Sequence, residues 1–206
     1  PRGELLVVDH GSGLYRIVQT PPTGKLPDFP RKLSETGIFS SVADYKVAPG
    51  VVPYAVNSPG WTDGATAERH LALPGDTTLP FGGNRGWELR ERAVIIQTLS
   101  MGDHRIETRL MTRQSNEWAG YSYRWNKEQT EAELVGKNGL DIEIEVAGEK
   151  QPWRIPGRAE CMSCHSRADN FILGLTANQL NRDHAYDAGP APQLETRKKL
   201  GVLSGY

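Results

Sequence analysis

The chain has 206 residues, of which 24 are basic and 25 acidic, so its formal net charge is −1. This near balance gives no overall field that would indicate nucleic acid or an anionic membrane as a partner. The hydrophobic content of 37% is sufficient for a folded core, and no apolar run approaches the roughly 18 residues of a transmembrane helix. We therefore predict a globular protein with no nucleic-acid partner and no transmembrane segment.

The first 50 residues contain a predicted hairpin and a linker. Residues 3–10 and 13–18 are two short β runs joined by a Gly-Ser-Gly turn, which predicts a β-hairpin within residues 1–19. Residues 20–30 carry four prolines and one glycine among 11 residues, a composition typical of a linker. In the rest of the 20–50 segment we expect only a short helix, around residues 31–39.

Residues 51–156 are predicted to form a β-rich domain. Their β-branched and aromatic residues gather in short runs separated by Pro, Gly, Asn and Asp. These runs are 51–56, 69–73, 93–99, 105–112, 118–125 and 141–146. Because no helical pattern lies between them, we expect an antiparallel, sandwich-like arrangement.

Side-chain alternation is clearest in the run that begins at Arg105. Residues of one parity are apolar or β-branched and should share one face, namely Ile106, Thr108 and Leu110. Residues of the other parity should share the opposite face, namely Glu107, Arg109, Met111 and Arg113. The aromatic residues of the next run fall on both parities, namely Trp118, Tyr121, Tyr123 and Trp125. We therefore expect both surfaces of that strand to be covered.

The pattern changes after Pro156. Residues 158–166, 176–182 and 191–200 are predicted helices, interrupted by glycine and proline residues between them. Residues 157–206 should therefore form a small helical region beside the β-rich domain. The predicted fold class is α+β.

The two cysteines of the chain lie in Cys161-Met162-Ser163-Cys164-His165, within the first of these helices. Two thiols three residues apart on one helical turn can add across the two vinyl groups of a haem. The next residue then lies beneath the iron as its proximal ligand. The sequence therefore predicts one covalent haem c held by Cys161 and Cys164, with His165 as an iron ligand.

Other uses of a paired cysteine motif fit this sequence less well. A structural zinc site needs four ligands, and the chain has no second cysteine pair. A thioredoxin-like redox pair would follow the first strand of a βαβ unit, a pattern that is missing before residue 161. Two buried cysteines beside a surface histidine are the remaining interpretation.

The second iron ligand is not decided by the sequence. His184 follows the motif histidine by 19 residues, and Met111 is an apolar thioether on an otherwise charged strand face. We expect a protein side chain to fill this position, with His184 preferred over Met111. The alternative for His184 is a surface position on a charged loop. The alternative for Met111 is a methionine that fills a gap in the core. Met101 and then His104 are the next candidates, while His10 and His70 are expected at the surface or in a hairpin.

Two arginines flank the motif. Arg158 precedes it and Arg167 follows it, and either guanidinium can pair with a haem propionate through two parallel hydrogen bonds. An exposed arginine on a helix is the alternative interpretation of both.

In this order the segments of the chain resemble a family of bacterial, planctomycete-type extracytoplasmic c-type cytochromes, whose haem region follows a glucose/sorbosone-dehydrogenase-like β-propeller. The segments that carry the resemblance are 3–11, 33–39, 52–65, 106–110, 120–126 and 158–165. The resemblance implies that the first hairpin corresponds to the end of such a propeller. Family members often have a second Cys-x-x-Cys-His motif, which this chain lacks, so one haem is predicted.

We therefore expect an electron-transfer domain rather than a catalyst. Its iron would accept electrons from a linked dehydrogenase domain or a partner redox protein, and no catalytic acid, base or nucleophile is required. Because haem c is attached outside the bacterial cytoplasm, the motif implies a periplasmic or extracellular protein. Residues 1–3 begin no signal peptide, so we expect a processed product or an excised piece.

Two other classes of function remain open at this point. A haem enzyme, or a sensor of peroxide or a diatomic gas, would leave the distal iron position open. A carbohydrate-binding or docking module would expose the aromatic side chains of residues 118–125.

Overall fold

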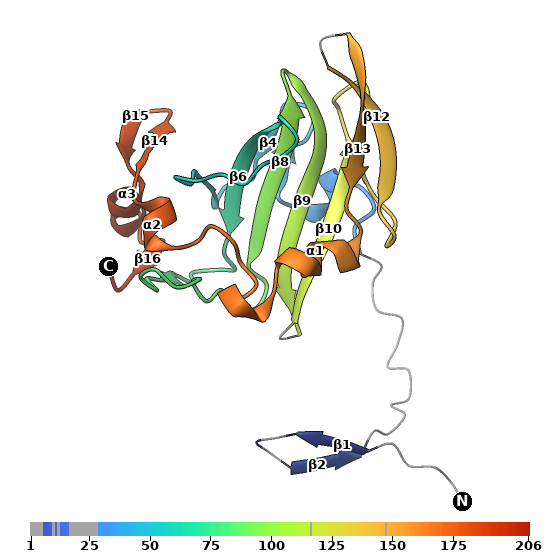
Figure 1. Ribbon diagram of the computed structural model, residues 1–206. Helices are drawn as coiled ribbons and strands as arrows, with labels where there is room; N and C mark the ends of the chain where they lie inside the picture. Colours follow the sequence, from blue (N-terminus) through green and yellow to red (C-terminus); the bar gives the residue numbers. More distant parts are fainter. Residues whose placement is uncertain (1–5, 10, 12, 17–28, 116, 147) are drawn as a thin grey trace, which may run out of the picture.

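The computed structural model describes residues 6–206 except 10, 12, 17–28, 116 and 147. Its centre is a six-stranded antiparallel sheet with the strand order β11–β10–β9–β8–β6–β5 (Figure 1). The strands are β5 (Val51–Tyr54), β6 (Thr66–Ala72), β8 (Val94–Met101), β9 (His104–Gln114), β10 (Glu117–Trp125) and β11 (Ala132–Leu134). The α+β class and the antiparallel sheet predicted from the sequence are confirmed.

The three longest strands of the sheet follow one another as hairpins. Between β8 and β9 only two residues turn the chain, and Gly102 adopts a φ of +55° there, in the left-handed region that favours glycine. Both faces of these strands are buried. This explains why β8 reads as a nearly continuous apolar run rather than as a strict alternation.

One face of the sheet is covered by the segment that precedes β5. This segment contains the 3₁₀ turn η1 (Leu33–Thr36) and the short strands β3 (Phe39–Ser41) and β4 (Lys46–Val47). The buried residues of this layer are Leu33, Ile38, Phe39, Val42, Ile96, Leu110, Tyr121, Tyr123, Trp125 and Ala132. The short helix expected at 31–39 is therefore a single 3₁₀ turn.

The opposite face is covered by the segment after residue 139 together with residues 79–89, and it is called the motif face below, because the Cys-x-x-Cys-His helix packs there. Its helical elements are α1 (Arg158–Cys164), η2 (Arg167–Asp169), α2 (Ala177–Leu180) and α3 (Gln193–Lys199). Two hairpins lie beside them, β12 (Leu140–Val146) with β13 (Glu149–Ile155), and β14 (Asp183–Tyr186) with β15 (Gly189–Pro192). A parallel bridge joins β7 (Leu79–Pro80) to β16 (Leu203–Ser204).

Residues from both sides of Pro156 share one core on the motif face. The buried cluster there runs from Tyr54 through Met111 to Leu203, with Cys161 packed against it. The sequence division at 156 therefore marks a change of secondary structure and not a gap in packing. The predicted helices at 158–166, 176–182 and 191–200 are present in shortened form, but the region also contains the unpredicted hairpin β14–β15.

A β-bulge in β9 changes the expected side-chain faces. Ser100 pairs with Arg105 and Leu99 pairs with Glu107, so Ile106 is the extra residue. Ile106 packs with Leu99 on the motif face, whereas Leu110 packs on the other. The prediction that Ile106 shares a face with Thr108 and Leu110 is therefore wrong, because one inserted residue reverses the alternation.

The outer edge of β5 is occupied by side chains from the C-terminal segment. The Gln193 amide accepts a hydrogen bond from the Ala55 N–H at 3.1 Å and donates one to the Ala55 carbonyl at 2.7 Å. Arg197 donates to the Pro53 carbonyl at 2.7 Å. These bonds satisfy backbone groups that a seventh strand would otherwise engage.

The N-terminal hairpin pairs β1 (Leu6–Asp9) with β2 (Gly13–Arg16) in antiparallel register, as predicted. The linker predicted at 20–30 lies almost entirely outside the described residues. In the described part of the chain, none of the helices combines the length and apolar character needed to cross a bilayer.

Candidate functional site

Helix α1 carries both cysteines on one turn. Its start is fixed by Glu160, whose carboxylate accepts hydrogen bonds from the Gly157 N–H at 2.7 Å and from Arg154 at 2.9 Å. Arg154 and the Gly157 N–H together hold the pKa of Glu160 below its usual value. The helix ends one residue before His165, whose N–H donates to the Cys161 carbonyl at 3.1 Å.

A close approach between α1 and β10 depends on Gly120. A Cβ atom at this position would lie 2.5 Å from Cys161 Cβ and 2.7 Å from Cys161 Sγ. The missing side chain therefore lets the first cysteine rest directly on the sheet. Cys161 is half-buried and Cys164 is exposed, and both are free thiols. Burial raises the pKa of the Cys161 thiol.

The ring of His165 is held by a backbone carbonyl. Its Nδ1 lies 2.7 Å from the Phe171 carbonyl oxygen. Because a carbonyl can only accept, Nδ1 carries the proton and Nε2 keeps its lone pair. An imidazole oriented in this way is the usual arrangement of a histidine ligand to a metal, since the second bond fixes both tautomer and ring direction.

The loop that supplies this carbonyl has an unusual backbone. Asn170 and Phe171 adopt φ values of +48° and +64°, in the left-handed region. For a bulky residue such as Phe171 this conformation costs on the order of 1 kcal/mol. The loop is held by a bond from the Phe171 N–H to the Ser166 carbonyl at 2.8 Å and from the Asn170 amide to the Gly86 carbonyl at 2.6 Å. Local strain thus accompanies the bond that orients His165.

These residues fit the chemistry of a covalent haem. Two free thiols stand one turn apart, and the following imidazole presents an unprotonated nitrogen. No disulfide joins Cys161 to Cys164, so both sulfur atoms are available to form bonds.

The two arginines predicted to flank the cofactor differ in their surroundings. The guanidinium of Arg158 lies 4.4 Å from the ring centroid of Tyr121, a residue of the face opposite α1. Arg167 is exposed in η2, directly after the motif. Arg158 is therefore already engaged by an aromatic ring, whereas Arg167 is directed to solvent.

Met111 lies beside the motif. It is 6% exposed on the motif face, and its sulfur would be 3.2 Å from a Cβ placed on Gly120, the same point that Cys161 Sγ approaches. Met111 also belongs to the buried core cluster. The structure thus brings Met111 and Cys161 together, in a position that also serves core packing.

His184 lies elsewhere, on strand β14. It lines a cleft of about 1260 Å³ between strands β5 and β6 and the hairpin β14–β15. Helix α1 contributes none of the described residues that line this cleft. Burial and the charge of Arg197 lower the pKa of His184, which is half-buried with its ring 4.7 Å from that of Tyr186. The helical surroundings expected for His184 are wrong, because this stretch forms a β-hairpin.

The lesser candidates are scattered. Met101 packs against the cluster of Leu99 and Trp153, and His104 is exposed at the start of β9. His70 is only 8% exposed, so a surface position is wrong, whereas its strand β6 does pair antiparallel with the neighbouring strand β5, as the hairpin alternative expected. Its strand lies inside the sheet between β5 and β8, and its ring packs edge-on against Tyr45 with centroids 6.4 Å apart. His10 lies outside the described residues.

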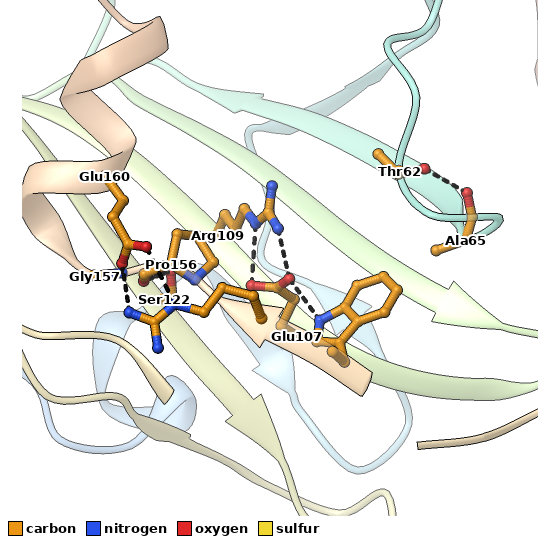
Figure 2. A network of polar contacts seen from close by, with 10 residues as sticks. Thr62, Ala65, Glu107, Arg109, Ser122, Pro156, Gly157 and Glu160 are labelled. Carbon is orange, nitrogen blue, oxygen red and sulfur yellow. Dashed lines mark hydrogen bonds and ion pairs between the residues drawn. The ribbon is translucent and has the colours of Figure 1, made fainter. Parts of the chain in front are cut away.

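A buried charged network on the motif face was not predicted (Figure 2). Glu107 is fully buried, and its carboxylate accepts bonds from Arg109 at 2.7 and 3.0 Å and from the Trp153 indole at 3.0 Å. The side chain of Arg109 remains 32% exposed. A charged residue that alternates with apolar ones usually marks a solvated strand face, so the sequence pattern gave no signal for this burial.

The aromatic residues of β10 are mostly interior. Tyr121, Tyr123 and Trp125 are 7%, 0% and 5% exposed and pack in the core opposite α1. Trp118 packs on the motif face, as the alternation predicted. A carbohydrate-binding surface made by exposed aromatics of this strand therefore has no support.

Within the described ranges, no three His, Cys, Asp or Glu side chains converge in a way that could hold a metal ion by themselves. No family model, curated protein or solved structure matches the chain.

Proposed function

We propose that this chain is a c-type cytochrome domain that transfers electrons through one haem attached to Cys161 and Cys164. The observation that carries the proposal is the environment of His165. Its Nδ1 is bonded to the Phe171 carbonyl at 2.7 Å, so that Nε2 keeps its lone pair on the residue that directly follows the second of two free thiols. A carbonyl that accepts from Nδ1 is the usual partner that orients a histidine bound to a metal through Nε2.

The attachment requires only the two thiols and the two vinyl groups of the haem. Each S–H adds across one C=C bond, so that the sulfur bonds to one carbon and the hydrogen goes to the other. Two C–S bonds form, two S–H bonds break, and no atom leaves. The protein should therefore gain the full mass of one haem.

Bound haem supplies a one-electron couple between ferric and ferrous iron. Residues of this chain would control how that couple behaves. His165 would supply a neutral nitrogen ligand whose basicity is increased by the Phe171 carbonyl. Cys161, half-buried over Gly120, would fix one edge of the ring against the sheet, while the exposed Cys164 would leave the other thioether accessible. An accessible edge is what electron exchange with another protein requires.

The distal ligand is proposed to be a protein side chain, and Met111 now has more support than His184. Met111 shares its surroundings with Cys161, whereas His184 lines a cleft to which α1 does not contribute among the described residues. A thioether ligand would raise the reduction potential relative to a second histidine.

The proposal is tested by expressing the chain with a bacterial cytochrome c maturation system and an export signal. We expect haem staining to remain with the protein after denaturing electrophoresis, and the intact mass to rise by that of one haem. Extraction of the haem into acidified organic solvent would rule out covalent attachment.

Absorption and magnetic-resonance spectra of the same sample identify the ligands. A low-spin ferric spectrum that is lost in Met111→Leu but kept in His184→Ala would assign Met111. The reverse result would assign His184. A high-spin parent that binds carbon monoxide rapidly would instead indicate a haem enzyme or gas sensor with an open iron position.

A further inference from the structure

We propose that Arg69, Gln97 and Arg109 form a binding site for the two propionate carboxylates of the haem held by Cys161 and Cys164. This inference rests on the proposed function. It assigns to these residues the propionate-binding role that the flanking arginines were expected to fill. It starts from a row of polar side chains on the motif face of the central sheet, called the polar row below.

The polar row follows from strand register. Arg69 of β6 pairs with Gln97 of β8, and Gln97 pairs with Arg109 of β9. Directly paired residues point to the same face, and neighbouring strands lie about 4.8 Å apart. The two arginines therefore stand about 10 Å apart at their Cα atoms, with an amide between them.

The face they occupy is the one that carries α1. Two residues further along the same strands, at the same parity, lie Leu71, Ile95 and Met111, which belong to the core cluster against which Cys161 packs. Arg109 is also near the thiol itself. It opposes the effect of burial, which raises the pKa of Cys161.

Arg109 is held in place by a fully buried carboxylate. Glu107 binds its Nε and Nη2 atoms at 3.0 and 2.7 Å and is itself fixed by the Trp153 indole. A buried carboxylate is costly, and here it directs a guanidinium that is one-third exposed along the sheet beside α1 (Figure 2). The Nη1 edge of Arg109 takes no part in that pair and is free to donate to a further carboxylate.

Arg69 is a half-buried charge that lacks an acidic partner. Its guanidinium donates to the Ala67 carbonyl at 3.2 Å, and burial lowers its pKa. No carboxylate of the described residues lies within ion-pair distance of it. Arg69 also lines the cleft of about 1260 Å³ that His184 lines, so the polar row runs from β9, the strand beside β10, to the edge of that cleft. Such a cation is stabilised by an anion placed beside it.

Arg158 suits the same role less well. Its guanidinium rests on the ring of Tyr121, whose side chain belongs to the opposite face of the sheet. Arg167 is exposed on η2 rather than fixed over the sheet. The polar row combines two guanidiniums on the motif face with a buried anchor for one of them.

The test compares reduction potentials of haem-loaded variants. Reduction adds an electron, so a positive charge beside the propionates favours the ferrous form. We expect Arg69→Gln to shift the equilibrium against reduction by about ten-fold, which is about 59 mV for a one-electron couple. Arg69→Lys, which keeps the charge, should show only a small part of that shift and keep a potential near that of the parent. Arg109→Lys should lower the potential less, because the charge remains and the fork is lost.

Matched controls keep the test decisive. Arg158→Gln and Arg167→Gln should each change the equilibrium constant of haem reduction by less than two-fold relative to the parent. Arg109→Lys avoids leaving Glu107 as an unpaired buried charge, and Arg69→Gln removes a cation without an acidic partner, so both variants should fold. Unchanged potentials in Arg69→Gln and Arg109→Lys, or a larger shift in either control, would overturn the polar-row assignment.

Two further outcomes separate this inference from neighbouring ones. A parent protein without covalent haem would end the proposed function, and the polar row would lose its ligand with it. A calorimetric titration of the haem-loaded parent with succinate tells whether the polar row is occupied by haem propionates or is a site for free dicarboxylates. No binding is expected, whereas succinate binding that Arg69→Gln abolishes would contradict the propionate assignment.

Discussion

The central strands β8–β10 and the C-terminal segment that carries the motif are specified in different ways. The strands are long, pair with their sequence neighbours and bury both faces. The elements after Pro156 are short: α1 and α3 have seven residues each and α2 has four. Isolated helices below about 12 residues are marginal in water, so these elements depend on the sheet for their stability.

This contrast suggests a division of labour between the two regions. The sheet supplies the rigid surface, through Gly120, Met111 and the polar row, and the short segment supplies the chemically reactive groups. The proposed haem attachment should therefore be removable without loss of the sheet, while damage to the motif face should affect both regions.

The largest effect is expected from removing both thiols. Cys161→Ala with Cys164→Ala should abolish covalent haem completely, because no other cysteine is present in the chain. The strand signal in circular dichroism should persist, since both side chains lie outside the sheet. Haem staining and intact mass measure the first effect. Loss of strand signal in the double variant would show that the sheet depends on the motif.

The second effect concerns the anchor of the polar row. Glu107→Ala should lower the free energy of unfolding by about 3 kcal/mol, because it leaves Arg109 and the Trp153 indole without their shared acceptor. Glu143→Ala is the control, since Glu143 pairs with Lys150 at the surface and should cost no more than about 0.5 kcal/mol. Denaturant unfolding followed by tryptophan fluorescence measures both. Equal costs would mean that burial of Glu107 contributes nothing.

The third effect tests the contact between the two regions. Gly120→Ala should destabilise the protein by about 2 kcal/mol, because the new Cβ would overlap the side chain of Cys161. Gly136→Ala is the matched control, since no atom lies within 4 Å of its Cβ position. Covalent haem content should fall in Gly120→Ala as well, and unchanged stability there would mean that α1 can shift without penalty.

The smallest effect is a pH dependence. Burial, with a further contribution from His184, lowers the pKa of His70 below its ordinary value of 6.5, so the unfolded chain binds a proton more readily than the folded one. Stability is therefore complete above about pH 6.5 and falls as the pH decreases below it, by at most about 1.4 kcal/mol per pH unit for one histidine. Denaturant unfolding of the parent, His70→Gln and the exposed control His104→Gln between pH 5 and about 8 measures the slope. Only His70→Gln should reduce it.

Much of the sheet was predictable because its sequence pattern is local. Five of the six β runs correspond to β5, β6, β8, β9 and β10 of the sheet, and the sixth corresponds to β12 of a separate hairpin. The errors have physical causes that sequence alternation does not reveal. One inserted residue at Ile106 reverses a face, and Pro152 lies within β13, in a two-stranded hairpin outside the main sheet, where the loss of a donor is tolerated.

The candidate haem site was predictable only for the residues whose role depends on their spacing in the sequence. The positions of Cys161, Cys164 and His165 follow from the motif, but the partner of His165 does not. Nothing in the sequence of Phe171 indicates a left-handed backbone whose carbonyl faces an imidazole. Arg69 and Arg109 are 40 positions apart in the chain and meet only through pairing of each strand with β8.

The side chains along the outer edge of β5 have a consequence for the protein in solution. Gln193 reproduces the donor and acceptor pattern of a neighbouring strand, and Arg197 occupies the next carbonyl. A second molecule therefore finds no free ladder of backbone groups there onto which it could add a strand. The same C-terminal segment that follows the motif thus keeps the sheet from templating its own aggregation, and shortening the chain before Gln193 would open that edge.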